Sequence, residues 1–195
     1  MVKEIKKDLK SIYKKSQHRY KHVMGVMETG LELAEIYGVD KEKVKLAALM
    51  HDYTKYYSSK KQKKLIKKHF DNPETIIDGF PDTLYHAFTA SVVANEKYDI
   101  DDQDVLMAIM HHTVGRPNMS MLEKIIFISD YIEPNRDYDS CKKVRKIVLK
   151  EGNLNKGILK AMKDSIKNAE KKDKLVPELA KLAYRYYLKE CEASE

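Results

Sequence analysis

The sequence predicts an all-α protein, and three observations support this fold class. Only 7 Gly and 5 Pro occur among 195 residues, about half the share of an average soluble protein, so turns are scarce. Charged residues make up 34% of the chain, and together with many Leu and Ala they favour helices. Apolar residues recur at helical spacing in most segments. We expect one helical bundle over residues 1–195 rather than a turn-dense β-sandwich or barrel.

The first part of the chain is predicted to form three helices. The first has a stripe of apolar residues on one face: Ile5, Leu9, Ile12 and Tyr13. A second helix is expected from about Gln17 to Tyr37, with Gly38 as its C-cap and with an inward face of Val23, Met27, Leu31 and Ala34. Asp40 is expected to cap a third helix. Near its end His51 and Asp52 follow Ala47 and Ala48 by four residues, so both polar groups face the buried side.

The rest of the chain is predicted to continue the bundle. A lysine-rich helix is expected from about Ser58 to His69, and the breakers Pro73, Gly79 and Pro81 predict an irregular connection after it. Five further helices are expected over Leu84–Lys97, Asp104–Thr113, Ser120–Ile132, Leu154–Ala169 and Pro177–Glu190. We expect a metal-site core over about 18–136, with the C-terminal helices at about 153–191 completing the bundle. Their apolar stripe leaves open whether the protein is a monomer or a homodimer.

The composition limits the possible partners and location. A net charge of +7 favours anionic partners. The lysine run at 60–68 has no interleaved aromatic residues, so we expect a solvated helix face and no specific nucleic-acid binding. No apolar run can cross a bilayer and no signal peptide is recognisable. Cys141 and Cys191 form no redox motif. These features predict a cytoplasmic protein that does not bind membranes.

Metal-capable side chains recur on the apolar helix faces, and this is the main functional signal. Asp130, for example, follows Ile126 by four residues and Leu122 by eight, and a buried carboxylate is costly unless it is paired or coordinated. A divalent cation would satisfy several such groups together, because imidazole and carboxylate suit zinc, iron and manganese. The alternative is that each histidine is an ordinary hydrogen-bonded core residue. The candidate ligands are His22, His51, Asp52, His86, His112 and Asp130.

Several motifs resemble one known family. The ordered set of His, His-Asp and distant Asp is similar to the HD superfamily of metal-dependent phosphohydrolases. The longer strings resemble the bacterial YqeK-type symmetrical bis(5'-nucleosyl)-tetraphosphatases: HRYKHVMGV at 18–26, HDYTK at 51–55, LYHA at 84–87, HTVGRPNM at 112–119, LEKI at 122–125 and DYIEPNR at 130–136.

The resemblance implies an HD-type helical bundle over residues 1–195, two divalent ions and a hydrolytic reaction. One ion would be held by His22, His51, Asp52 and Asp130, and the other by His86 and His112 with Asp52 as a bridge. Iron is the first choice of metal that the resemblance implies, while the ligand types also permit manganese, cobalt or zinc. A metal-activated water would cleave diadenosine tetraphosphate symmetrically into two ADP.

The residues beside the ligands are candidates for substrate binding and catalysis. Lys55 and Arg116 are expected to bind phosphate and stabilise developing charge. Arg136 is a third candidate, for which a surface salt bridge is the alternative. Thr113 could donate a hydrogen bond to phosphate or cap its helix, and Gly115 could allow a turn close to the ligand or simply end the helix. We also expect Asp52 to orient the nucleophilic water and His111 to serve as a wall, proton-relay or general-acid residue.

Two other functions compete with this interpretation. Another HD-type phosphohydrolase would act on a nucleoside monophosphate, a deoxynucleotide or a cyclic dinucleotide. A non-catalytic, basic helical binding module would use the histidines only for structure. The products formed from diadenosine tetraphosphate, together with the metal content of the protein, discriminate among the three.

Overall fold

The computed structural model describes residues 1–193, and within them it has eleven α-helices, a 3-10 turn, a π-helical turn and no strand. In chain order the elements are α1 (Val2–Ile12), α2 (Gln17–Tyr37), α3 (Lys41–Met50), α4 (Ser59–His69), α5 (Pro73–Ile77), η1 (Asp82–Leu84), α6 (Tyr85–Tyr98), α7 (Gln103–His111), α8 (Met121–Ile132), α9 (Asp139–Arg145), η2 (Lys146–Lys150), α10 (Leu154–Glu170) and α11 (Glu178–Glu192). The predicted all-α class is confirmed.

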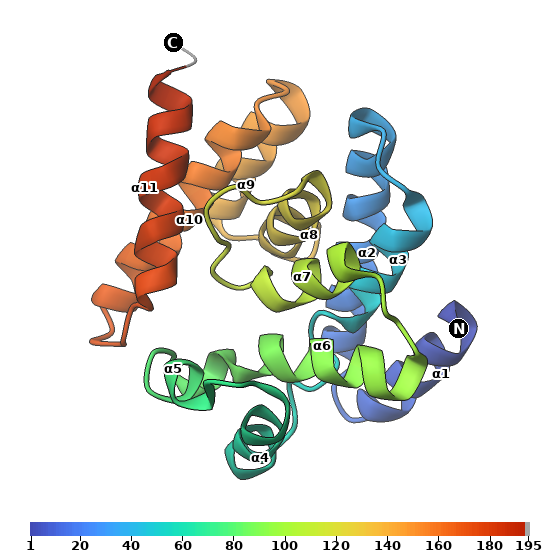
Figure 1. The fold of residues 1–195 in the computed structure, drawn as a ribbon. Helices are drawn as coiled ribbons and strands as arrows, with labels where there is room; N and C mark the ends of the chain where they lie inside the picture. The colour runs from blue at the N-terminus through green and yellow to red at the C-terminus, as the bar shows by residue number, and fades with distance from the viewer. Residues whose placement is uncertain (194–195) are drawn as a thin grey trace.

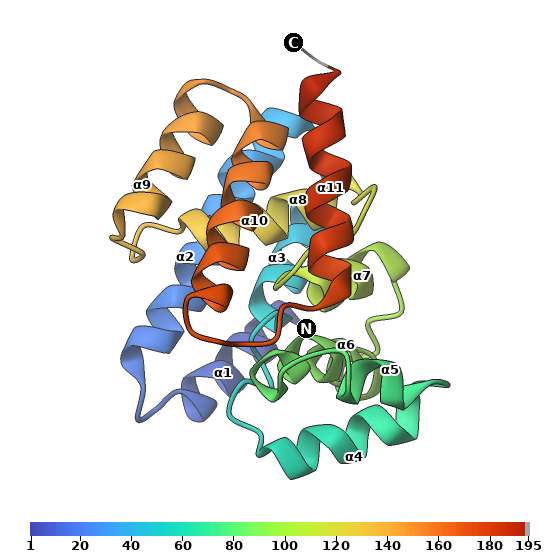
Figure 2. The same ribbon diagram turned by 90° about the vertical axis from the view of Figure 1, so that its left-hand side faces the viewer.

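Helix α8 lies at the centre of the molecule. It packs on α2, α3 and α7 on one side and on α10 on the other, while α11 packs on α10 (Figure 1). The turned view shows α10 and α11 side by side in front of α8, with α4, α5 and α6 gathered at one end (Figure 2). The main core lies between these helices, and Leu33, Leu49, Ile109 and Ile126 are completely buried in it.

The N-terminal helix α1 packs against α3. Its predicted apolar stripe is buried, since Ile5 and Leu9 are 0% exposed, and Tyr13 directly after the helix is buried with them. The Tyr13 hydroxyl donates a 2.8 Å hydrogen bond to the main-chain carbonyl of Asp52. Helix α1 therefore supports the turn that carries the HD pair.

Local sequence signals placed several helix ends correctly. Helix α2 spans Gln17–Tyr37, and Gly38 ends it with a φ of +66°, which glycine adopts without the steric cost paid by other residues. The Asp40 carboxylate accepts from the backbone N–H groups of Glu42 and Lys43 at the start of α3. At the start of α8, Ser120 and Glu123 form a reciprocal capping box.

The helices differ from the predicted ones in three respects. The segment predicted as irregular contains α5 and η1, because Pro73 occupies the first position of α5, where its missing N–H costs nothing. Helix α9 and the π-helical turn η2 were not predicted. Leu31, expected to face inward, is only partly buried. No helix among the described residues is long and apolar enough to cross a membrane.

Candidate metal centre

The six predicted ligands come together between five helices. His22 lies in α2, His86 in α6 and Asp130 in α8, while His51 and Asp52 follow the end of α3 and His112 follows the end of α7. The four histidines and Asp52 are buried, and the Asp130 side chain is 20% exposed. The structure thus brings together side chains from distant parts of the chain, of which His22 and Asp130 are 108 positions apart.

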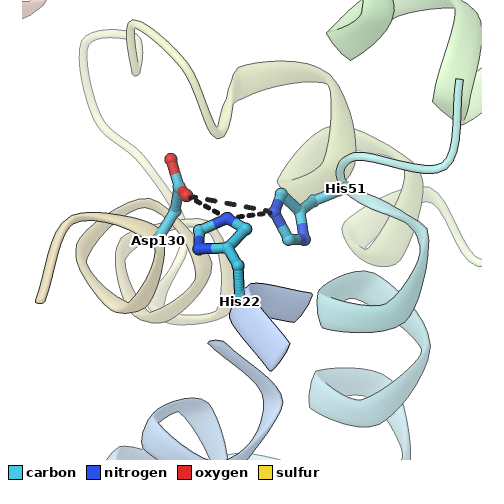
Figure 3. Close-up of side chains that lie close together, drawn as sticks. All are labelled: His22, His51 and Asp130. Carbon is cyan, nitrogen blue, oxygen red and sulfur yellow. Dashed lines mark hydrogen bonds and ion pairs between the residues drawn. The ribbon is translucent and has the colours of Figure 1, made fainter. Parts of the chain in front are cut away.

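One group of possible ligands consists of His22, His51 and Asp130, which point toward one another (Figure 3). The Oδ1 atom of Asp130 lies 3.1 Å from His22 Nε2 and 3.9 Å from His51 Nε2. The two Nε2 atoms are 3.4 Å apart. Three ligand atoms within 4.8 Å of one another could hold one metal ion.

A second group lies on the other side of Asp52. His51, Asp52 and His112 also offer ligand atoms within 4.8 Å of one another. The Oδ1 atom of Asp52 lies 3.1 Å from His86 Nε2 and 3.7 Å from His112 Nε2, whereas its Oδ2 atom lies 3.8 Å from both His22 Nε2 and His51 Nε2. The two carboxylate oxygens therefore face different histidine pairs, as a bridging ligand requires.

The hydrogen bonds of the Nδ1 atoms orient every histidine of the centre. His51, His86 and His112 donate from Nδ1 to the main-chain carbonyls of Ala48, Thr83 and Ile109, over 2.6, 2.9 and 2.7 Å. His22 Nδ1 lies 3.1 Å from the Glu133 carboxylate. A carbonyl can only accept, so these bonds place the proton on Nδ1 and leave the Nε2 lone pair directed into the centre. This is the arrangement that metal-ligating histidines normally have.

The surroundings of His112 test whether a metal fits. With its Nδ1 proton donated to Ile109, its Nε2 faces His86 Nε2 at 3.3 Å and Asp52 Oδ1 at 3.7 Å. Both of these neighbours are acceptors, and the nearby Lys55 ammonium group lies on His86 and Asp52, so the His112 Nε2 lone pair faces two other lone pairs without a donor from either. A divalent cation resolves that repulsion, and four imidazoles with two carboxylates suit such a cation.

The pKa shifts of His51, His86 and Asp52 favour cation binding, whereas that of His22 means that a bound cation would have to displace a proton from its ring. Burial lowers the pKa of His51 to about 3 and that of His86 to about 4, which keeps both neutral at pH 7. Burial raises the pKa of Asp52, but its electrostatic interactions with the neighbouring His51 ring and the Lys55 ammonium group outweigh burial and hold that pKa well below its ordinary value. For His22, burial lowers the pKa, whereas hydrogen bonds to Asp130 and Glu133 raise it to about 9.

Three cationic side chains surround the two carboxylates. Lys55 Nζ lies 2.9 Å from His86 Nε2 and 3.5 Å from Asp52 Oδ1. Arg136 donates from Nη2 to Asp130 Oδ1 over 2.7 Å, and Arg19 Nη1 lies 3.4 Å from Asp52 Oδ2. Lys55 and Arg136 were predicted at the site, and Arg19 was not.

The structure places Arg116 and His111 in a separate cluster around the buried Glu123. Arg116 donates from Nε and Nη2 to the two Glu123 oxygens over 2.7 and 2.6 Å. His111 Nδ1 lies 2.9 Å from Glu123 Oε1. Gly115, with a φ of +69°, turns the chain between them, and a Cβ there would lie 2.5 Å from the Met162 methyl. Thr113 follows His112 and lines a neighbouring cavity.

Sequence reasoning assigned no role to Arg19, Glu123 or Glu133. Arg19 and Glu133 lie within strings that carried the resemblance, but no local pattern marks them as buried partners. Glu133 is 1% exposed and is 111 positions from His22, its partner. The one available signal was Ser120-x-x-Glu123, which identifies a capping box but not the ion pair with Arg116.

Comparison with known proteins agrees with this helical, metal-capable site. The family model for the HD domain matches residues 19–135. The chain is 47% identical over 130 residues to a Halalkalibacterium halodurans protein named bis(5'-nucleosyl)-tetraphosphatase, symmetrical, covering 67% of this chain and 68% of that protein. A Bacillus subtilis protein of the same name is 38% identical over 161 residues, covering 83% of this chain and 84% of that protein.

A solved structure supports the same class. It is a crystal structure from Clostridium acetobutylicum, described as a predicted HD superfamily hydrolase involved in NAD metabolism. It is 33% identical, has a TM-score of 0.86, and covers 97% of this chain and 98% of that one. Fold and site together define a helical protein with a buried cluster of histidine and aspartate side chains that could hold a metal ion. The chain belongs to the HD domain family, and the resemblance inferred from its motifs is confirmed.

Proposed function

We propose that this protein is a symmetrical bis(5'-nucleosyl)-tetraphosphatase that cleaves diadenosine tetraphosphate into two ADP. The observation that carries the proposal is the complete set of six ligand side chains, divided into two groups on either side of Asp52. Relatives with this activity in their names cover most of the chain. A site with room for two cations suits phosphate-ester chemistry.

The proposed ligand set is His22, His51, Asp52 and Asp130 for one ion, and Asp52, His86 and His112 for the other. Bound divalent ions would supply an activated water and neutralise charge on the phosphoryl oxygens. Iron is our first choice of metal, and the nitrogen and oxygen donors also accept manganese, cobalt or zinc.

The cationic side chains at the centre would bind the polyphosphate. Lys55 and Arg136 contact the ligand carboxylates from half-buried positions, so each can also reach a phosphate oxygen beside them. Arg19 lies on the same carboxylate as Lys55 and joins this group. Arg116 is held by Glu123. We infer that Arg116 contributes to substrate binding by ordering the turn that carries Thr113 and Gly115. We also infer that His111, which contacts the same glutamate, acts as a wall, proton-relay or general-acid residue.

Product analysis tests the proposed reaction. The metal-loaded protein is incubated with diadenosine tetraphosphate, and the nucleotides are separated by chromatography. We expect two ADP per substrate, whereas ATP plus AMP would refute symmetrical cleavage. Parallel reactions with a nucleoside monophosphate, a deoxynucleotide and a cyclic dinucleotide test the other HD-type activities. Absence of both turnover and metal would favour a binding module.

Variants test the ligand assignment. His51→Ala and Asp52→Ala should lose bound metal, measured by elemental analysis, together with activity. His69→Ala is the matched control, because His69 lies at the end of α4 and pairs with Glu96 away from the centre. Wild-type metal content in either ligand variant would refute the assignment.

We infer a cytoplasmic location and a possible homodimer as secondary features. No disulfide links the two cysteines, and Cys141 is buried as a free thiol, which suits a reducing compartment. On α11, Ala183 and Tyr187 are buried within the bundle while Leu182 is 45% exposed. Light scattering of the purified protein measures whether two copies associate.

A further inference from the structure

An apolar cavity of about 220 Å³ is lined partly by residues that neighbour the candidate ligands in sequence. It is enclosed by η1, the turn after α7, α8, α10 and the connection from α10 to α11. In both views this connection lies beside α5 and α6 (Figures 1 and 2). Its walls include Leu84, Val114, Phe127, Met162 and Leu175.

Three of the segments that line the cavity also carry candidate metal ligands. Thr83 lines it, and the Thr83 carbonyl accepts the Nδ1 hydrogen bond of His86. Thr113 also lines it and directly follows His112. Phe127 lies three residues before Asp130 on α8. A ligand in the cavity would therefore contact residues that are one to three positions from three of the candidate ligands.

The size and chemistry of the cavity limit what can occupy it. Its volume is below the roughly 300–1,000 Å³ of pockets that hold whole drug-sized ligands, so it fits one flat ring system rather than a complete nucleotide. Its walls are mostly apolar, as stacking on a ring face requires. Ser165 and Asn168 lie one turn apart at its exposed rim on α10, and an asparagine amide can pair with the edge of a purine.

The mouth of the cavity is basic. Lys172 and Lys174 line it from the connection between α10 and α11, and both are exposed. Lys55 and Arg136 supply further positive charge at the metal centre itself. A ligand with an apolar ring and an attached chain of phosphates complements this combination, whereas an uncharged apolar ligand would leave the lysines without a counterion.

We propose that this cavity binds one nucleobase of the substrate, with the polyphosphate running past Thr113 to the metal centre. The inference rests on the proposed function and extends it by assigning the side chains that distinguish a nucleotide from a bare polyphosphate. Phe127 and Met162 form the deep wall, Leu175 closes the outer side, and Asn168 faces the base edge.

Binding of a product nucleotide tests the cavity separately from catalysis. Calorimetry measures the Kd of ADP and of inorganic pyrophosphate for the metal-loaded wild-type protein. Since stacking of one base contributes about 1–3 kcal/mol, we expect ADP to bind roughly fivefold to a hundredfold more tightly than pyrophosphate. Ala169→Phe, which fills the cavity from a half-buried position on α10, should remove that advantage and leave the Kd of pyrophosphate unchanged.

A milder pair of variants controls for loss of folding. Leu175 is 52% exposed and lines the cavity, whereas Leu182 is 45% exposed and lies outside it. Leu175→Ala should weaken ADP roughly threefold to tenfold through the lost apolar contact, and Leu182→Ala should not. Equal Kd values for ADP in wild type and Ala169→Phe, or equal weakening of ADP and pyrophosphate, would overturn the proposal. A wild-type protein that binds ADP as expected but leaves the dinucleotide intact would refute the proposed function alone.

Discussion

Replacing Glu123 by glutamine should destabilise the protein by about 3 kcal/mol at pH 7, because this carboxylate accepts four hydrogen bonds while 1% exposed. Its Oε1 accepts from His111 Nδ1 and Arg116 Nε, and its Oε2 accepts from Arg116 Nη2 and the Ser120 backbone N–H. A glutamine keeps one oxygen and puts an amide donor where the other was. Two donors then lose their acceptor, and each buried unsatisfied donor costs about 1–3 kcal/mol.

The same hydrogen bonds lower the pKa of Glu123, and the size of that shift is consistent with this magnitude. Burial raises this pKa, but hydrogen bonds from His111 and Arg116 lower it more, to about 2 from an ordinary value of 4.5. A difference of about 2.5 pKa units corresponds to about 3 kcal/mol. Because the folded-state pKa is the lower one, this stabilisation is fully present above about pH 4.5 and is lost as pH falls toward 2.

Urea unfolding of wild type and Glu123→Gln at several pH values measures both effects. A chelator is added, because bound metal would stabilise the folded state of both proteins by its own binding energy. The difference in unfolding free energy should be about 3 kcal/mol at pH 7 and should shrink below pH 4.5. Glu178→Gln is the matched control: Glu178 also pairs with an arginine, Arg185, over 2.7 Å, but both side chains are mostly exposed, so its loss should stay below about 1 kcal/mol.

Two results would refute this reasoning. A Glu123→Gln protein within about 0.5 kcal/mol of wild type at pH 7 would show that the four hydrogen bonds are not needed for stability. A difference that stays constant down to pH 3 would show that the stabilisation does not come from the ionised carboxylate.

Two further substitutions probe the supports of the metal centre. Tyr13→Phe removes the buried hydroxyl that donates to the main-chain carbonyl of Asp52, and it should lower the unfolding free energy measured in urea by about 1–3 kcal/mol. Tyr56→Phe is the control, because the Tyr56 hydroxyl lies at the exposed surface, and it should change the unfolding free energy little. Equal effects of the two substitutions would contradict the expectation. Gly25→Ala places a Cβ 2.5 Å from Glu133 Oε2, which should displace this partner of the α2 histidine and weaken metal binding about 10–100-fold in a chelator competition. Gly30→Ala on the same helix meets Val44 instead and should leave the metal affinity unchanged.

The sequence predicted elements whose determinants are local. The α2 helix was predictable because apolar residues recur at helical spacing from Gln17 to Tyr37. Its end was predictable because Gly38, which follows, can adopt the left-handed conformation that ends a helix. Helix α9 has only seven residues and begins shortly after Pro134. Two helical turns are too few for a repeating pattern of apolar residues to be recognised in the sequence. Its burial depends on packing against α8 and α10, which is tertiary information.

The candidate site divides in the same way. Polar groups in line with apolar faces pointed to the six candidate ligands that the fold brings together, because burial of a helix face can be inferred from spacing. Their partners could not be found by that route. Arg19 and Glu133 are charged residues near helix ends, where such residues are normally solvated, and only the fold brings them to Asp52 and His22.

The position of each histidine in its helix explains which supports are local. His51 and His112 directly follow the ends of α3 and α7, where the last carbonyls lack an intrahelical partner, and each ring donates to the carbonyl three residues earlier. His86 uses the carbonyl of Thr83 in η1 in the same way. These three ligands carry the acceptor that fixes their orientation within their own segment.

His22 differs because it lies inside α2, where the nearby carbonyls already accept backbone hydrogen bonds. Its Nδ1 atom therefore needs an acceptor from elsewhere, and Glu133 supplies it across the bundle. Gly25, one turn later on α2, leaves the space that the Glu133 carboxylate occupies. The orientation of this ligand depends on the docking of α8 against α2, so perturbations of that interface should affect the His22 and Asp130 group more than the His86 and His112 group.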